Sequence, residues 1–329
     1  MMHERQKSDP GVVAQKLANK SGRPEAESVE RRPGAKGNMV GLHTHRTQGR
    51  MAVSQRLDRV RQAARQRKKE RFTALFHHFD TDLLRESFFW LQRKAAAGID
   101  GVTWCDYERD LEVRLSELRD RLHRGAYRAL PSRRQYIAKP DGSQRPLGIA
   151  ALEDKIVQRA VVEVLNAVYE ADFLGFSYGF RPGRRQHDAL DALAVGITCT
   201  SVNYIVDADV EKFFDRLNHN WLMRFLEHRL GDPRILRLIR KWLKAGVMEE
   251  GVVTRAETGT PQGAVVSPLL ANVYLHYVFD LWAQQWRHRH ARGSMIIVRY
   301  ADDSIVGFER RDDAERFLSE MRARMEQFG

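Results

Sequence analysis

Residues 295–308 decide the fold, and they read Met-Ile-Ile-Val-Arg-Tyr-Ala-Asp-Asp-Ser-Ile-Val-Gly-Phe. Two apolar runs, Met295–Arg299 and Ser304–Phe308, predict two strands joined by a tight turn. The turn contains Asp302 and Asp303, and because turns favour Asp, an isolated pair of this kind is usually just solvated. Here the apolar flanks predict a hairpin buried in a larger sheet. Burying acids at the end of such a sheet costs free energy unless they bind metal or basic partners.

A second acidic segment lies upstream, where residues 207–215 read Asp-Ala-Asp-Val-Glu-Lys-Phe-Phe-Asp after the apolar run Tyr204-Ile205-Val206. The run predicts a short buried strand, and Asp207 and Asp209 would share one of its faces. Asp209 could alternatively cap a helix or pair with Lys212. If this strand ends beside the acidic hairpin, three carboxylates converge, and such a cluster favours a hard divalent cation such as Mg²⁺. Two such ions can support phosphoryl transfer.

The remaining sequence predicts a mixed α+β architecture. Residues 135–138 and 145–149 predict a β-hairpin around a Pro-Asp-Gly turn. Ser267 is expected to cap a helix that has Pro268 at its first position. Apolar periodicity predicts further helices over residues 82–97, 106–122, 153–170, 187–195, 220–230, 234–245 and 312–328.

The composition excludes several classes of protein. The 329 residues contain 55 Lys and Arg against 43 Asp and Glu, a net charge of +12, and only two Cys. Two Cys cannot form a disulfide scaffold, and these two lack the spacing of a zinc site. No secretory signal is visible. The uncharged stretch Thr258–Phe279 contains Pro, Gln, Asn and His that hydrocarbon would leave unsatisfied, so no membrane partner and a reducing cytoplasm are expected.

The positive charge is concentrated at the N-terminal end. Residues 1–70 carry 17 Lys and Arg against 7 Asp and Glu, a net of +10, while the rest of the chain is nearly balanced. Residues 1–50 lack apolar periodicity, which predicts a mostly disordered leader. Regular structure is expected from about Ser54, in a helix with a cationic face between Arg56 and Arg71 that is either simply solvated or an RNA contact. The predicted organisation is a leader over 1–53, a helical extension over 54–130 that leads into the body, and an α+β body over 131–329.

Five motifs in order give a specific resemblance. They are Arg-Pro-Leu-Gly-Ile at 145–149, Gly-Phe-Arg-Pro-Gly at 179–183, Asp209 with Phe-Phe-Asp at 213–215, Thr-Pro-Gln-Gly at 260–263, and Tyr-Ala-Asp-Asp at 300–303. The set resembles the reverse transcriptases encoded by bacterial group II introns, the intron maturases. The resemblance implies right-hand polymerase fingers and palm and an RNA-directed DNA polymerase. Its partners would be dNTPs, an RNA template with a DNA primer, and the intron RNA, which it would also help to splice.

The resemblance also implies roles for the acidic residues. Asp209 and Asp302 match the family's main metal-holding acids, and Asp303 matches the second acid of the hairpin. Val210 is assigned to the same metal site, which would hold two Mg²⁺ ions. Phe214 falls five residues after Asp209, at a position where an aromatic ring would clash with a ribose 2′-OH; plain core packing is the alternative.

Four further residues match positions that contact substrate. Lys139 and Arg145 match residues that grip the incoming triphosphate through a point charge and a planar fork. Gln262 matches a residue beside the nucleotide pocket, and Arg181 lies in a loop expected near the template. Without the motifs, Lys139 and Arg145 would be ordinary surface charges and Gln262 a polar loop residue.

The resemblance also sets an expectation for the end of the chain. Family members continue beyond Phe328-Gly329 with a Lys-bearing strand, a thumb and a maturase domain. We therefore expect an incomplete palm, a missing thumb and weak polymerase activity from this polypeptide alone. Two alternatives stay open: an RNA-binding splicing cofactor without synthesis, and a reverse transcriptase of a defence or diversity-generating system.

Overall fold

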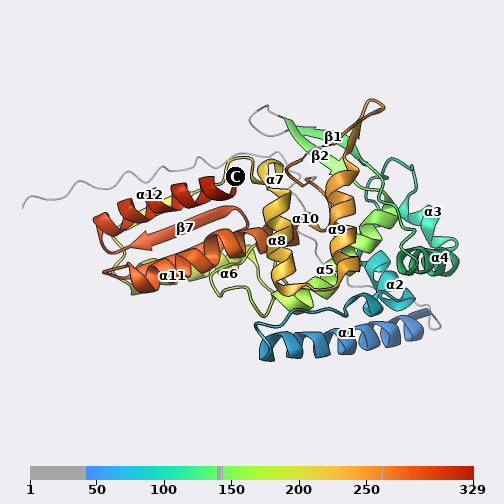
Figure 1. The fold of residues 1–329 in the computed structure, drawn as a ribbon, viewed down its shortest axis with the longest axis horizontal. Helices are drawn as coiled ribbons and strands as arrows, with labels where there is room; N and C mark the ends of the chain where they lie inside the picture. Colours follow the sequence, from blue (N-terminus) through green and yellow to red (C-terminus); the bar gives the residue numbers. More distant parts are fainter. Residues whose placement is uncertain (1–41, 139–141, 143, 256, 261) are drawn as a thin grey trace, which may run out of the picture. The chain divides into compact units, whose positions relative to one another are not determined.

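The computed structural model describes residues 42–138, 142, 144–255, 257–260 and 262–329. The basic leader up to residue 41 lies outside these residues. Within the described part, two β-sheets are embedded among helices, and the mixed α+β class expected from the sequence is confirmed (Figure 1).

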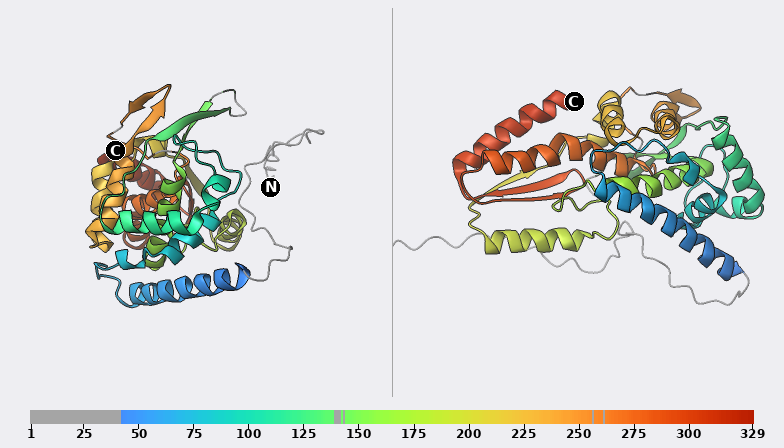
Figure 2. Two further views of the ribbon diagram at one scale, coloured as in Figure 1. Left: turned by 90° about the vertical axis from the view of Figure 1, so that its right-hand side faces the viewer. Right: turned by 60° about the horizontal axis from the view of Figure 1, so that its bottom comes forward.

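The first sheet contains the decisive hairpin. Strands β6 (Met295–Tyr300) and β7 (Asp303–Phe308) pair antiparallel, and β3 (Tyr204–Ala208) pairs antiparallel with β7, giving the order β3-β7-β6. Helix α12 (Arg311–Phe328) packs on one face, where Phe317 contacts Phe308. Helix α6 (Gln186–Cys199) lies on the opposite face, with Gly196 against Ile296 (Figure 2).

The expectation that strand 204–206 is buried is wrong for two of its three residues. Tyr204 and Ile205 are 42% and 49% exposed, whereas Val206 is buried. The reason is that β3 forms an edge of the sheet, so its side chains have a neighbouring strand on one side only.

The second sheet has the order β2-β1-β4-β5. Strands β1 (Ser132–Ala138) and β2 (Gln144–Ile149) form the hairpin predicted from the sequence. Strands β4 (Val247–Glu249) and β5 (Val252–Thr254) form a second hairpin that was not predicted, and β4 runs parallel to the start of β1. The body thus has a second β-layer in addition to the sheet that carries the acids.

Helix α5 (Leu152–Tyr169) is buried on almost every side and lies within the helical core. Helix α1 (Leu42–Gln66) packs on α5 and α2 (Thr81–Trp90) through Val53, Leu57, Val60 and Ala64 (Figure 2). These four residues form its apolar stripe; a helix was predicted in this part of the chain, but its start was not. Because α1 begins at Leu42, the expectation of a disordered leader is wrong for residues 42–53.

Three predicted helices differ from the structure, and one of them, expected over 187–195, continues to Cys199 as α6. The helix expected over 82–97 ends at Trp90, because Leu91 takes an extended conformation and turns into the core. The helix expected over 106–122 is two helices, α3 (Trp104–Glu108) and α4 (Leu111–His123), since Asp110 leaves the helical conformation between them.

Among the other helices, α10 contacts α5, whereas α11 packs against α12 and the first sheet through Trp286. Ser267 is the first residue of α10 rather than its cap, and its hydroxyl bonds that of Thr260 at 2.6 Å. None of the helices in the described ranges combines the length and apolar character needed to cross a bilayer. The remaining bounds are η1 Phe76–His78, α7 Phe213–Arg216, α8 His219–Arg229, α9 Pro233–Ala245, α10 Ser267–Leu275, the π-helical turn η2 His276–Asp280 and α11 Leu281–Arg289.

Candidate active site

The strand register brings the predicted acids to one end of the first sheet. In the β6–β7 hairpin, Tyr300 pairs with Asp303, which leaves Ala301 and Asp302 as the two turn residues. On the other side of β7, Ala208 pairs with Ser304. Asp209 therefore leaves β3 one residue later, beside Asp303, so two segments almost a hundred residues apart in sequence place their carboxylates at the same sheet end.

The negative charge at this end of the sheet is not neutralised by ion pairs from the described residues. The pKa of Asp303 is raised above its ordinary value, first by partial burial of the carboxyl and then by the negative charges of Asp302, Asp209 and Asp207. No Lys or Arg in the described part of the chain forms an ion pair with these four carboxylates. A cation placed here would relieve their mutual repulsion.

The acids are near enough to repel one another, but they do not form a complete set of metal ligands. Across the described residues, no three Asp, Glu, His or Cys side chains converge in a way that could hold a metal ion. The donor chemistry nevertheless fits Mg²⁺, which binds through one or two carboxylates and keeps other positions for water and substrate phosphates. Asp209, Asp302 and Asp303, with the carbonyl of Val210, are the groups that could take part.

The turn bearing Asp302 is held in an uncommon backbone conformation. Ala301 has φ of +58°, in the region that favours glycine. Gly179 lies directly against it, because a Cβ at residue 179 would be 2.2 Å from the backbone nitrogen of Ala301. The glycine of the 179–183 motif therefore permits a close approach between that loop and the acidic turn.

The segment after Asp209 is anchored to the loop of the 260–263 motif. Phe213 is buried in the core, and Phe214 is partly buried against it. The backbone nitrogen of Thr260 donates to the carbonyl of Phe214 at 2.7 Å. Gly259 makes this contact possible, since a Cβ there would lie 2.6 Å from the carbonyl oxygen of Asp215.

Three polar side chains connect the second sheet to this segment. Arg145 Nε, on β2, donates to Gln262 Oε1 at 3.3 Å, and Gln262 Nε2 lies 3.4 Å from Asp215 Oδ1. The backbone of Gln262 accepts a 2.7 Å hydrogen bond from Gly148 of β2. The structure thus brings together the predicted residues Arg145, Gln262 and Phe214, while Lys139 lies outside the described residues.

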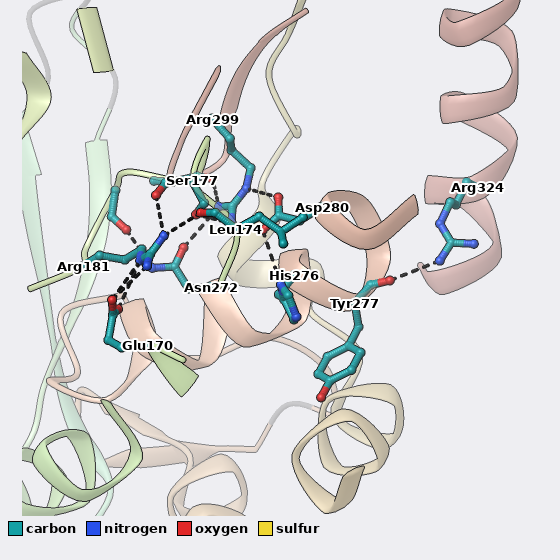
Figure 3. Close-up of polar contacts among 12 residues, drawn as sticks. Glu170, Leu174, Ser177, Arg181, Asn272, His276, Tyr277, Asp280, Arg299 and Arg324 are labelled. Carbon is teal, nitrogen blue, oxygen red and sulfur yellow. Dashed lines mark hydrogen bonds and ion pairs between the residues drawn. The ribbon is translucent and has the colours of Figure 1, made fainter. Parts of the chain in front are cut away.

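Arg181 is placed differently from the other predicted residues. Its side chain is 4% exposed and pairs with Glu170 at 2.9 Å. Its Nη1 donates to the carbonyls of Leu174 and Ser177, both at 2.8 Å (Figure 3). These bonds hold the 174–181 loop, so the guanidinium has an internal role here, and the predicted template contact receives no support from this geometry.

Sequence reasoning passed over two charged residues under the acidic turn, Arg299 and Asp280. They form a buried ion pair with a 2.7 Å Nη2–Oδ2 distance, and their side chains are 1% and 0% exposed. The signal was present in the sequence. Arg299 is the one charge in the apolar run before the acids, and Asp280 ends the uncharged stretch 258–279.

Comparisons with known proteins agree with the motif order. Residues 137–329 match the family model described as reverse transcriptase (RNA-dependent DNA polymerase). The chain is 37% identical over 239 residues to protein YkfC of Escherichia coli strain K12, covering 64% of this chain and 62% of that protein. It is 33% identical over 226 residues to the group II intron-encoded protein LtrA of Lactococcus lactis subsp. cremoris, covering 67% of this chain and 37% of that protein.

The chain therefore spans less than two thirds of the length of either relative. Among solved structures, a chain of a partial Cas6-RT-Cas1--Cas2 complex aligns with 78% of this chain and 43% of its own length. That alignment has 21% sequence identity and a TM-score of 0.44.

Proposed function

The chain belongs to the reverse transcriptase family, and on that premise we propose that it forms the fingers and palm of a group II intron-encoded RNA-directed DNA polymerase. It would add dNTPs to a primer 3′-hydroxyl on an RNA template. It would also bind the intron RNA as a splicing maturase.

The observation that carries the proposal is the meeting of two residue groups. Asp209, Asp302 and Asp303 lie at one end of the β3-β7-β6 sheet. The segment that follows Asp209 is fixed by a 2.7 Å hydrogen bond to the loop containing Gln262, which is in turn bonded to Arg145. The acids that would hold a cation are thus connected through the backbone and the 260–263 loop to the groups that would hold a triphosphate.

Each residue has a physical role in this proposal. Asp209, Asp302, Asp303 and the Val210 carbonyl would hold Mg²⁺. When bound, two such ions would activate the attacking hydroxyl and stabilise the leaving oxygen. Arg145 and Lys139 would bind phosphate oxygens of the dNTP, and Gln262 would border the base and sugar.

Phe214 would exclude a ribose 2′-OH from the nucleotide site.

In the reaction, a bond forms between the primer 3′-oxygen and the α-phosphorus, and the bond to pyrophosphate breaks. The hydroxyl proton passes to water. The protein's contribution is to position the two reactants and to neutralise charge, since phosphoryl transfer asks for little covalent chemistry from side chains.

The RNA contact would include the cationic face of α1. Arg59, Arg65, Lys68 and Lys69 are exposed on or just after this helix, while its apolar stripe is buried. Such cations bind phosphates without reading bases. They would hold an RNA backbone next to the catalytic body.

Primer extension tests the proposal. Oligo(dT) annealed to poly(A) should be extended by dTTP in the presence of Mg²⁺, and Asp302→Asn should abolish the extension while leaving RNA binding intact. RNA binding with no synthesis by the wild-type chain would instead favour the splicing-cofactor alternative. Synthesis that persists in Asp302→Asn would contradict the assignment of the site.

A further inference from the structure

The guanidinium of Arg299 is fully engaged directly beneath the acidic turn. Nε and Nη2 donate to the two carboxylate oxygens of Asp280, both at 2.7 Å. Nη1 donates to Asn272 Oδ1 at 3.1 Å and to the Ala301 carbonyl at 2.7 Å, and Nη2 also donates to Ser177 Oγ at 2.7 Å. All five N–H groups of the side chain are therefore used. Figure 3 labels the partners Asp280, Asn272 and Ser177.

One of these bonds reaches the turn itself. Ala301 immediately precedes Asp302, and its φ of +58° is costly for a residue with a Cβ. A charge-assisted hydrogen bond to its carbonyl stabilises this conformation from the buried side. Arg299 thus donates a hydrogen bond to the backbone of the turn one residue before Asp302.

The surrounding contacts fix Arg299 in turn. Asn272 Nδ2 donates to the Gly179 carbonyl at 2.7 Å, and Gly179 is the residue that lies against Ala301. The backbone of Arg299 is also bound, because its nitrogen donates to Phe176 and its carbonyl accepts from Tyr178, both at 2.8 Å. The loop of the 179–183 motif and the turn are therefore tied to one side chain.

Asp280 is the counter-charge, and an irregular helix supplies it. It is the last residue of the π-helical turn His276–Asp280 between α10 and α11. Burial favours the neutral acid, but the neighbouring Arg299 charge holds the pKa of Asp280 below its ordinary value. π-Turns are rare and are frequent at functional sites, which agrees with a role in placing this carboxylate.

We propose that Arg299 is a positioning residue for Asp302, acting through the Ala301 carbonyl and held by Asp280. The inference rests on the proposed function, because it assigns a purpose to the geometry of the same metal site. A purely structural ion pair would affect only the stability of the fold. If Arg299 positions Asp302, loss of the guanidinium fork should also weaken cation binding at Asp302 and slow nucleotide addition.

The test compares two buried arginines of similar chemistry. Arg299→Lys keeps the charge but cannot donate five bonds. The matched control is Arg229→Lys, because Arg229 is also 1% exposed and binds Asp172 at 2.7 Å, but its other bonds go to carbonyls at the end of α1 and just after it. Mn²⁺ binding by electron paramagnetic resonance and single-turnover dNTP addition are measured on the full chain, together with thermal unfolding.

Arg299→Lys should weaken Mn²⁺ binding by about tenfold, as loss of a group that orients metal ligands usually does. It should slow addition by about 10²-fold, the cost of a small misplacement at a reacting centre. The dNTP dissociation constant should change little. Arg229→Lys should lower the melting temperature without either effect.

Ser177→Ala removes one acceptor of Arg299 and provides a milder variant, with Mn²⁺ binding expected to weaken about threefold. If Arg299→Lys and Arg229→Lys behave equally in Mn²⁺ binding, or if Ser177→Ala leaves Mn²⁺ binding unchanged, the positioning role is overturned.

Asp302→Asn separates the two proposals. If it leaves Mn²⁺ binding unchanged, the metal site itself is wrong; if it removes Mn²⁺ while Arg299→Lys does not weaken it, only the role of Arg299 is wrong.

Discussion

At the residue scale, Phe214 offers a test of substrate choice. Its ring is partly buried against Phe213, and its carbonyl is fixed by Thr260, so its place beside the 260–263 loop is well defined. Phe214→Ala should reduce the preference for dNTP over rNTP by up to about 10²-fold, the scale on which an apolar pocket rejects an added hydroxyl. Competing incorporation of dTTP and UTP measures the preference.

Phe214→Tyr is the matched control, since it keeps the ring and should keep the preference. If Phe214→Ala lowers the melting temperature but leaves the preference unchanged, Phe214 is a packing residue and not a sugar gate.

Asp154 provides a pH-dependent prediction away from the acidic turn. Burial raises its pKa to about 6, although Tyr127 donates a hydrogen bond to it and Leu130 N donates another at 3.1 Å. The folded protein therefore keeps a proton on Asp154 at pH values where the unfolded chain has lost it. The free energy of unfolding should fall as pH rises from about 4 to about 6, and the penalty should stay constant above that.

Asp154→Asn removes this titration. Between pH 5 and pH 7.5, the variant should gain about 1.4 kcal/mol relative to the wild type in urea unfolding, which is one pKa unit of difference. A stability difference that does not change with pH would show that Asp154 is ionised in the folded protein throughout this range.

At the element scale, the docking of α1 can be tested by its apolar stripe. Leu57 is 2% exposed among the residues that face α5 and α2. Leu57→Ala should lower the free energy of unfolding by about 2–5 kcal/mol because it leaves a cavity. Met51→Ala, at a residue 58% exposed on the same helix, should change it little. Equal stability of the two variants would mean that α1 does not belong to the cooperative unit.

The elements also show where sequence reasoning succeeded. Strands β6 and β7 were predicted within one residue, because two apolar runs around a short polar turn leave few alternatives. The β4–β5 hairpin was missed because its turn is Glu250-Gly251, both with positive φ of 48° and 83°. Such a turn is usually marked by Asn or Asp at its first position, and Glu gave no such signal.

Some features of the candidate site could be predicted from the sequence and others could not. The meeting of Asp209 with the hairpin followed from motif order, but the pairing of β3 with β7 could not be read from local sequence, because register depends on contacts between distant strands. The ion pair of Arg299 with Asp280 was not predicted for the same reason. Nineteen residues separate its partners, and a π-helical turn sets their alignment.

At the scale of the whole molecule, the charge distribution predicts how RNA binds. Residues 1–70 carry most of the net charge of +12, and part of that charge lies on the exposed face of α1. RNA affinity should fall steeply with salt. Arg59→Gln with Arg65→Gln should reduce the slope of log affinity against log salt by up to about 1.4, or 0.7 per lost phosphate contact with a single strand.

The matched control is the pair Arg311→Gln and Arg316→Gln on α12. These cations pair with Glu315 and Glu320 at 2.8 and 2.7 Å, and the variant should leave the slope unchanged. Equal slopes in both double variants would contradict the assignment of α1 to the RNA contact.

The central claim is that the end of the β3-β7-β6 sheet is a nucleotidyl-transfer centre built around Asp209. The most direct measurement is single-turnover addition of one dNTP to a primer on an RNA template, in wild type, Asp209→Asn and Asp207→Asn. Asp207 lies on β3, two residues before Asp209, which follows the end of that strand, and it provides the closest control. The account predicts that Asp209→Asn slows addition by about 10³-fold or more, the scale of several kcal/mol of lost charge stabilisation, while Asp207→Asn stays near wild type. Equal losses in the two variants, or a loss in Asp207→Asn alone, would contradict it.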